Sequence, residues 1–323
     1  MTDREQTPDG DGTLNIAEKY GAAYEKHNKS TGERVIGILQ THREIFAGET
    51  MAKIGLILLT GFILMAVFGP YIVPHDPDAM NRGEEGELLR TEAPSSDHWF
   101  GTTERGQDVF SQTVVSTRIS LMVGGLGALM AVLIGTTIGI VSGYYGGWID
   151  DVLMRITDIA YGLPFLPFII VLVLILGPSL FNVIFAISLI MWRPTARVVR
   201  SQVLTVKERP FVEAADAAGA SNPRIMAKHI LPNVLPLALL YSALSVAWAI
   251  SAEASVAFIG FGDPDFWSWG KMIEQAFNSG LIREAWWWIF WPGFALSILV
   301  VSVFFITRAY EKVTNPELSQ QAG

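Results

Sequence analysis

Few residues in this sequence have the types and spacing needed for catalysis or metal binding. The chain of 323 residues contains no cysteine, which excludes disulfides, thiolate metal sites and cysteine nucleophiles. Its five histidines show no pair at the spacing of metal ligands, so we predict no bound metal. Gly270-Lys271 is followed by methionine, so no phosphate-binding loop is present. We therefore expect neither enzymatic activity nor a cofactor on this chain.

Glu253 is the most unusual ionisable residue, because it is the one carboxylate in the apolar run from Ile250 to Ile259. An ionisable group in a membrane is costly unless it is paired or hydrated. Two interpretations stay open: Glu253 lines or shapes a gate, or it is an interfacial acid whose carboxylate reaches water.

The segment from Phe211 to Pro232 lacks a nucleophile and base, but it has the pattern of an exposed helical hairpin. Alanine-rich residues favour a helix over Val212–Ala218, and Gly219 permits a positive φ at its end. Ser221 can cap a following helix that has Pro223 in its first turn. A helix with such small side chains is suited to lie in a groove of a partner protein.

The composition indicates that membrane-spanning helices position these residues. Hydrophobic residues make up 50% of the chain and charged residues 17%, and the apolar residues gather in long runs. A formal net charge of -8 without a basic stripe argues against nucleic-acid binding. We predict an all-α integral membrane protein with six transmembrane helices in lipid. The expected spans are Ile54–Val73, Ile119–Val141, Ile159–Leu176, Leu180–Trp192, Val234–Ala252 and Trp287–Ile306.

The distribution of basic residues predicts that both termini are cytoplasmic. With six spans, 17 of the 23 lysines and arginines lie inside, and the segment from Arg193 to Lys228 is the richest loop. The fourth span is short, but that segment would lie outside if it did not cross. Glu253 then lies near the outer end of the fifth span. We interpret the tryptophans that open the last span at its outer end as interfacial anchors; these are Trp286, Trp287, Trp288 and Trp291.

Small residues and prolines mark two of the spans. The second span carries small residues four apart, which place a smooth face along one side of the helix and predict close helix packing. They are Gly127, Ala131, Gly135, Gly139, Gly143 and Gly147. Pro164 and Pro167 interrupt the third span and are expected to kink it, as suits a gated pathway.

The polar stretches divide the chain into three parts. We expect a partly flexible cytoplasmic tail over residues 1–50, a transmembrane domain over 51–310, and a second cytoplasmic tail over 311–323. The domain would contain an outer loop at about 75–117 and a cytoplasmic loop at about 193–230. The first apolar run is long enough to span, so we expect it to stay as an anchor.

The hairpin segment resembles the cytoplasmic signature of permease subunits of binding-protein-dependent ATP-binding-cassette (ABC) importers. That signature reads Glu-Ala-Ala, three residues, Gly, nine residues, Ile, any residue, Leu-Pro. Here Glu213, Ala214, Ala215, Gly219, Leu231 and Pro232 match in register. His229 stands at the isoleucine position, with Ile230 beside it.

Two further blocks resemble the C-type subunit of the dipeptide and oligopeptide permeases. The first runs from His98 to Asp108, with Gln107 where that family usually has arginine, and the second from Glu253 to Gly270. The resemblance covers about residues 45–317.

This resemblance implies a type I ABC importer permease fold in the inner or plasma membrane. The helix from Glu213 to Gly219 would be the coupling helix. The expected partners are a homologous permease in a heterodimer, two cytoplasmic ATPase subunits that bind ATP and Mg²⁺, and an extracytoplasmic substrate-binding protein. The expected cargo is dipeptides or oligopeptides, with oligosaccharides or nickel as alternatives. An ion-coupled secondary transporter is the alternative from another class, although it would need buried ionisable residues near mid-span.

Overall fold

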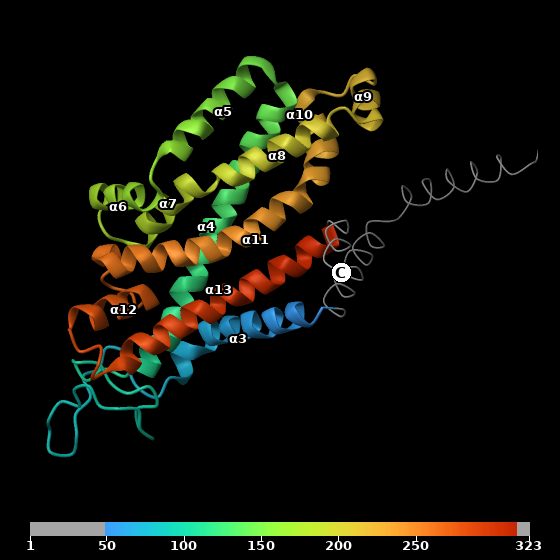
Figure 1. Ribbon diagram of the computed structural model, residues 1–323. Coiled ribbons are helices and arrows are strands. Elements are labelled where there is room, and N and C mark those ends of the chain that lie inside the picture. Colours follow the sequence, from blue (N-terminus) through green and yellow to red (C-terminus); the bar gives the residue numbers. More distant parts are fainter. Residues whose placement is uncertain (1–48, 315–323) are drawn as a thin grey trace, which may run out of the picture. The chain divides into compact units, whose positions relative to one another are not determined.

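The computed structural model describes residues 49–314, so most of the two predicted tails, 1–50 and 311–323, lies outside the described residues. The described part is helical apart from loops and two isolated β-bridges, Arg82↔Leu88 and Thr102↔Asp108. Figure 1 shows the arrangement of the helices within residues 51–314. In chain order the described helices are α3 Thr50–Ile72, α4 Val109–Tyr145, α5 Gly147–Gly162, α6 Phe165–Leu176, α7 Leu180–Met191, α8 Arg193–Val206, α9 Pro210–Ala217, α10 Asn222–Ile225, η1 Met226–Ile230, α11 Leu231–Val256, η2 Ala257–Phe261, α12 Trp269–Asn278 and α13 Trp286–Thr314.

The number of membrane crossings agrees with the prediction. Five stretches of helix in the described residues are long and apolar enough to cross a membrane, and a sixth crossing results if the bent pair α5–α6 is one span. The all-α membrane fold class is thereby confirmed, with five to six candidate spans in the described residues.

Helix α4 begins at Val109, inside the predicted outer loop of about 75–117. Asp108 caps this helix, and its carboxylate accepts a hydrogen bond from the Ser111 backbone N–H at 2.8 Å. The first turns of α4 are polar yet buried against the rest of the protein, so hydropathy alone does not reveal them as helix. The buried polar side chains there are Ser111, Gln112, Thr113, Ser116 and Thr117.

The predicted cytoplasmic loop, about 193–230, is mostly helical. Helix α8 follows α7 with only Trp192 between them, and together they form a 27-residue stretch that could span, Leu180–Val206. Val199 and Val203 of α8 are fully buried. The apolar part of the fourth span is therefore short, although the helical stretch is long enough to cross. The apolar run ends early because basic side chains occupy the outward side of the second half of this stretch.

The predicted third span, Ile159–Leu176, is two helices instead of one kinked helix. Helices α5 and α6 meet at an angle of 91°. Pro164 is the N-cap of α6, where its missing N–H breaks no helical hydrogen bond. Pro167 lies in the first turn of α6, which also tolerates proline, so it does not contribute a kink of its own.

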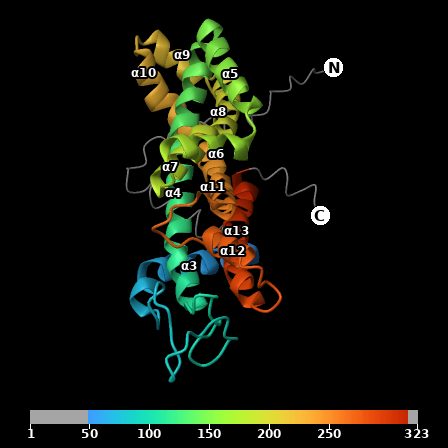
Figure 2. The same cartoon turned by 90° about the vertical axis from the view of Figure 1, so that its left-hand side faces the viewer.

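Helix α4 runs through the middle of the described domain and packs most extensively against α8 and α11. Figures 1 and 2 show it extending from the outer loop at one end to α9 and α10 at the other. An ideal Cβ on Gly135, Gly139 or Gly143 would lie 2.6 to 2.8 Å from atoms of residues 192–203. These glycines therefore allow α4 and α8 to approach closely. Gly147 does not belong to the predicted small-residue face, because α4 ends at Tyr145.

Candidate functional site

Helix α9 is the first arm of the predicted hairpin, and local sequence explains both of its ends. Pro210 occupies the first helical position, where its fixed φ favours helix and its missing N–H costs nothing. Val212 is buried at 5% exposure, whereas Glu213 and Ala214 on the same turn are exposed. The helix therefore rests on the protein through its apolar side and presents Glu213 and Ala214 on the other, while Ala215 is half-buried.

The end of α9 has the hydrogen bonds of a Schellman motif. Gly219 has φ +77°, and its N–H donates to the Asp216 carbonyl at 2.8 Å. The Ala220 N–H donates to the Ala215 carbonyl at 3.1 Å. Both alanines pack against one cluster of buried apolar residues, which includes Val212. Gly219 is needed for its backbone conformation, since no atom lies within 4 Å of an added Cβ.

The second arm contains a widened turn before the Leu-Pro pair. Residues 222–225 form α10, and Met226–Ile230 form a π-helical turn that leads into α11. Pro232 cannot donate to a carbonyl four residues earlier, and its ring crowds that position, which favours the wider turn. The Asn233 side-chain amide donates to the His229 carbonyl at 2.7 Å. Ser221 precedes α10 as predicted, but its side chain makes no capping hydrogen bond.

An apolar cluster connects the hairpin to three long helices. Val212 from α9 and Ile225 from α10 pack with buried residues of α4, α8 and α11. The ring centroids of Phe211 and His229 lie 6.4 Å apart, a further contact between the two arms of the hairpin. Tyr144 of α4 donates through its hydroxyl to Asn222 Oδ1 at 3.1 Å. The remaining buried members of the cluster are Ile140, Val199, Val203, Val206, Ile230, Val234 and Ala238. Close-packed side chains thus join α9 to the spans.

Ion pairs join α5 to α8 close to the hairpin. The Arg200 guanidinium donates to both oxygens of Asp150, at 2.6 and 2.5 Å, a bidentate arrangement. Arg197 pairs with Asp158 at 2.5 Å and lies 3.9 Å from the centre of the Tyr161 ring. Both arginines of α8 therefore hold α5, so the first half of the broken span is attached to the same helix that supports α9.

Glu253 is buried inside the chain, at 4% exposure, near the end of α11. Its Oε2 atom has no hydrogen-bond partner among the described residues. A cavity of about 10 Å³ adjoins it and is also lined by Asp263 and Ser268. Asp263 accepts a hydrogen bond from the Leu180 N–H at 2.7 Å, which ties this loop to the start of α7.

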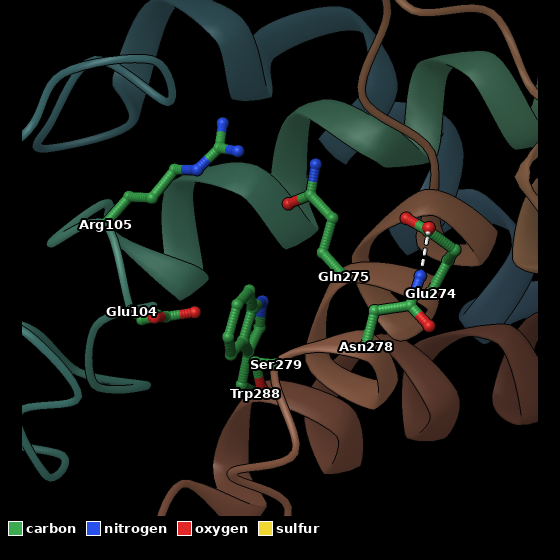
Figure 3. Close-up of a pocket in the computed structure, with 7 residues that line it drawn as sticks. All are labelled: Glu104, Arg105, Glu274, Gln275, Asn278, Ser279 and Trp288. Atoms are coloured by element: carbon green, nitrogen blue, oxygen red, sulfur yellow. Dashed lines mark hydrogen bonds between the residues drawn. The ribbon is translucent and has the colours of Figure 1, made fainter.

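A polar pocket of about 360 Å³ lies between the predicted outer loop and α12. Figure 3 shows Glu104 and Arg105 of the outer loop on one side of it, with Glu274, Gln275 and Asn278 of α12 on the other. Asn278 donates to Glu274 at 2.5 Å. No sequence pattern predicts this pocket, because its two sides are far apart in the chain.

Two of the tryptophans predicted as interfacial anchors hold the outer loop instead. Trp287 is buried at 5% exposure, and its Nε1–H donates to the Thr102 carbonyl at 3.2 Å. The Trp291 ring stacks on Phe100 with centroids 3.9 Å apart. Trp286, at 51% exposure, keeps the exposure expected of an anchor.

Two family models match this chain. The model described as a binding-protein-dependent transport system inner membrane component matches residues 135–319, which include the hairpin. The model described as the N-terminal TM domain of oligopeptide transport permease C matches residues 39–90.

Named relatives match most of the chain. The dipeptide transport system permease protein DppC of Bacillus subtilis is 38% identical over 83% of this chain and 82% of the relative. DppC of Alkalihalophilus pseudofirmus is 36% identical over 83% of this chain and 86% of the relative. The oligopeptide transport system permease protein OppC of Bacillus subtilis is 34% identical over 84% and 88%. In a solved inward-facing structure of the MetNI methionine ABC transporter, one chain is 19% identical, with a TM-score of 0.49 over 64% of this chain and 95% of that chain.

Proposed function

This chain belongs to the family of binding-protein-dependent transport system inner membrane components, and from that membership we propose that it forms half of the path through which an ATP-driven importer takes up dipeptides or oligopeptides. It is an ABC transporter permease subunit embedded in a membrane. The names of its relatives support the peptide cargo, because two are dipeptide permeases and one is an oligopeptide permease. Oligosaccharides and nickel are the alternative cargoes.

The observation that carries the proposal is the exposed small-residue face of α9. Glu213, Ala214, Ala217 and Ala218 are exposed although the helix itself is well anchored. Small side chains let the backbone of a partner approach closely, and Glu213 near the helix start can pair with a basic residue of that partner. We propose that an ATPase subunit receives α9 in a groove, one such subunit on each permease of a heterodimer.

Coupling would proceed by rigid movement of α9 and the helices to which it is packed. When the ATPase subunits close, α9 moves, and the cluster around Val212 and Ile225 carries α4, α8 and α11 with it. Arg197 and Arg200 pull α5 along through their carboxylate partners. ATP and Mg²⁺ would be bound and hydrolysed on the ATPase subunits, so the role of this chain is mechanical.

The gate would involve the break at Pro164 and the loop above Glu253. The right-angled junction of α5 and α6 is a place where one half-helix can turn relative to the other. Glu253 is enclosed by its own chain, so we propose that it shapes the outer gate through the 262–268 loop and does not line the pathway. Peptide would arrive there from an extracytoplasmic binding protein.

The experiment compares charge reversal at the two ends of the domain. Complexes of this chain with its sister permease, ATPases and binding protein are reconstituted in vesicles, and uptake of a labelled dipeptide is measured. We expect Glu213→Lys to lower ATPase retention and binding-protein-stimulated hydrolysis at least about tenfold, equivalent to about 1.4 kcal/mol of docking energy. Glu104→Lys, an equally exposed site in the outer loop, is the control and should retain the ATPases.

Further arms separate the alternatives. If a trisaccharide or Ni²⁺ inhibited dipeptide uptake by competition, the cargo would be an oligosaccharide or nickel and not a peptide. If this chain alone took up cargo when driven by an ion gradient, it would be a secondary transporter. Normal transport by Glu213→Lys would contradict the coupling assignment. Because the chain has no cysteine, Ala217→Cys and Glu104→Cys each create a unique label, and we expect an impermeant reagent to reach Ala217→Cys only from the cytoplasmic side.

A further inference from the structure

The outer loop brings together two histidines and an aspartate that are well separated in the sequence. His75 follows the end of α3, His98 lies in the middle of the loop, and Asp108 caps α4. The Nδ1 atom of His98 lies 2.8 Å from Asp108 Oδ1, and that of His75 lies 3.9 Å from the same oxygen. One potential ligand atom from each of the three residues lies within 4.8 Å of the other two.

Two of the three side chains are held rigidly. Asp108 is fully buried, and its Oδ2 atom accepts hydrogen bonds from the Ser111 N–H at 2.8 Å and the Ser111 hydroxyl at 2.7 Å. Oδ1 therefore remains for the histidines. The His98 backbone donates to Ser95 Oγ at 3.1 Å and accepts from the Gly101 N–H at 2.9 Å. Such support orients ligands before a metal arrives.

His75 supplies the observation that points to a missing ligand. Its Nδ1 atom is buried and has no hydrogen-bond partner among the described residues, although its side chain as a whole is 28% exposed. A buried polar atom without a partner is costly, and a bound ion is one of the groups that can satisfy it. The exposed edge of the ring provides an entry route for that ion.

We propose that His75, His98 and Asp108 bind a divalent cation of the zinc type. Bonds of about 2.0 to 2.1 Å in a tetrahedron place two ligand atoms about 3.3 to 3.4 Å apart. The observed separations from Asp108 Oδ1, 2.8 and 3.9 Å, lie on either side of that value, so binding requires the two imidazole rings to shift. Three protein ligands leave a fourth position for water on the exposed side of His75.

Metal binding through Nδ1 also defines the protonation of His98. In the metal-free cluster a proton on Nδ1 can be donated to the Asp108 carboxylate. With the metal in place that nitrogen would be a ligand and could not donate to Asp108, so Nε2 would carry the proton of the ring. The bound ion would link the end of α3 and the middle of the outer loop to the start of α4.

The test is metal binding by the purified full chain in detergent. The chain carries an affinity tag without histidines and the substitutions His27→Gln and His42→Gln, is stripped with chelator, and is titrated with Zn²⁺ and Co²⁺. We expect one Zn²⁺ per chain by elemental analysis and visible ligand-field absorption of low-coordinate Co²⁺. His75→Ala should weaken binding at least about tenfold. His229→Ala is the matched control and should bind as the parent does.

Two measurements distinguish a site from nonspecific effects. Thermal unfolding without metal should be the same for His75→Ala and the parent, and X-ray absorption at the zinc edge of the parent should show two imidazole ligands. If His75→Ala misfolds, the zinc-edge spectrum of the parent still decides. The proposal is overturned if the parent binds no stoichiometric zinc or if its zinc-edge spectrum lacks two imidazole ligands. It is also overturned if His75→Ala and His229→Ala bind zinc equally, because the metal would then be an adventitious ion only.

Discussion

The hairpin around α9 and the outer loop each contain a turn with a glycine at positive φ, but one glycine lies in open space and the other is tightly packed. Gly219 in the hairpin has φ +77° and Gly101 in the outer loop has φ +74°. A Cβ on Gly219 would meet no atom within 4 Å. A Cβ on Gly101 would lie 2.5 Å from Trp287 Nε1 and 2.6 Å from the Glu92 carbonyl oxygen. The hairpin turn is open, whereas the outer turn is closed over by its own chain.

The hydrogen bonds around the two glycines differ in the same way, because those of the outer loop join distant segments and those of the hairpin turn are local. In the outer loop, long-range hydrogen bonds from side chains to backbone join distant segments, such as Asn81 to the Gly106 carbonyl at 2.9 Å and Gln112 to the Pro77 carbonyl at 3.0 Å. The turn of the hairpin is closed by hydrogen bonds between near neighbours. A loop that is complete within its own chain contributes to stability, while a turn that leaves its face exposed is available to a partner. We therefore expect substitutions in the outer loop to affect folding and those in the hairpin to affect coupling.

The largest effect is expected from Gly101→Ala. The new methyl group would collide with a backbone oxygen and with Trp287, and alanine would also be strained at positive φ. Overpacking costs about 1 to 3 kcal/mol, and the left-handed conformation about 1 to 2 kcal/mol. Thermal unfolding in detergent should show the loss. Gly61→Ala, in an open position on α3, is the control and should not lower the unfolding temperature.

A smaller effect is expected from Trp287→Phe. This change keeps an aromatic ring but removes the Nε1–H donor to the Thr102 carbonyl and some buried volume. The loss should be about 1 to 3 kcal/mol by the same unfolding measurement. Trp286→Phe, next to it but half-exposed, should change stability by less than about 0.5 kcal/mol. Equal losses for both tryptophans would mean that interfacial anchoring, and not loop packing, dominates.

The smallest effect on stability is expected from Gly219→Ala. Only the backbone conformation is strained, so the loss should be about 1 kcal/mol and confined to the end of α9. Binding-protein-stimulated ATP hydrolysis should nevertheless fall more for this variant than for Trp287→Phe. If Gly219→Ala unfolded the chain as strongly as Gly101→Ala, the two turns would not differ in the way the structure indicates.

Much of the hairpin could be predicted because its determinants are local. The helix end at Gly219, the position of Ser221 and the exposed Glu213 follow from neighbouring residues. The π turn before Pro232 was not predicted, although the lack of an N–H at proline was a usable signal. The glycines of α4 suggested a close helix contact, but only the structure identified α8 as the helix that occupies it.

The sequence by itself determined the membrane class and the hairpin, since hydropathy and turn chemistry act over a few neighbouring residues. The tertiary structure alone decided which polar residues are buried in the first turns of α4, that Trp287 secures a loop, and that His75 and His98 share Asp108. The physical reason is that these features depend on contacts between segments far apart in the chain. Such contacts leave no periodic pattern, because a loop is positioned by the surfaces it meets.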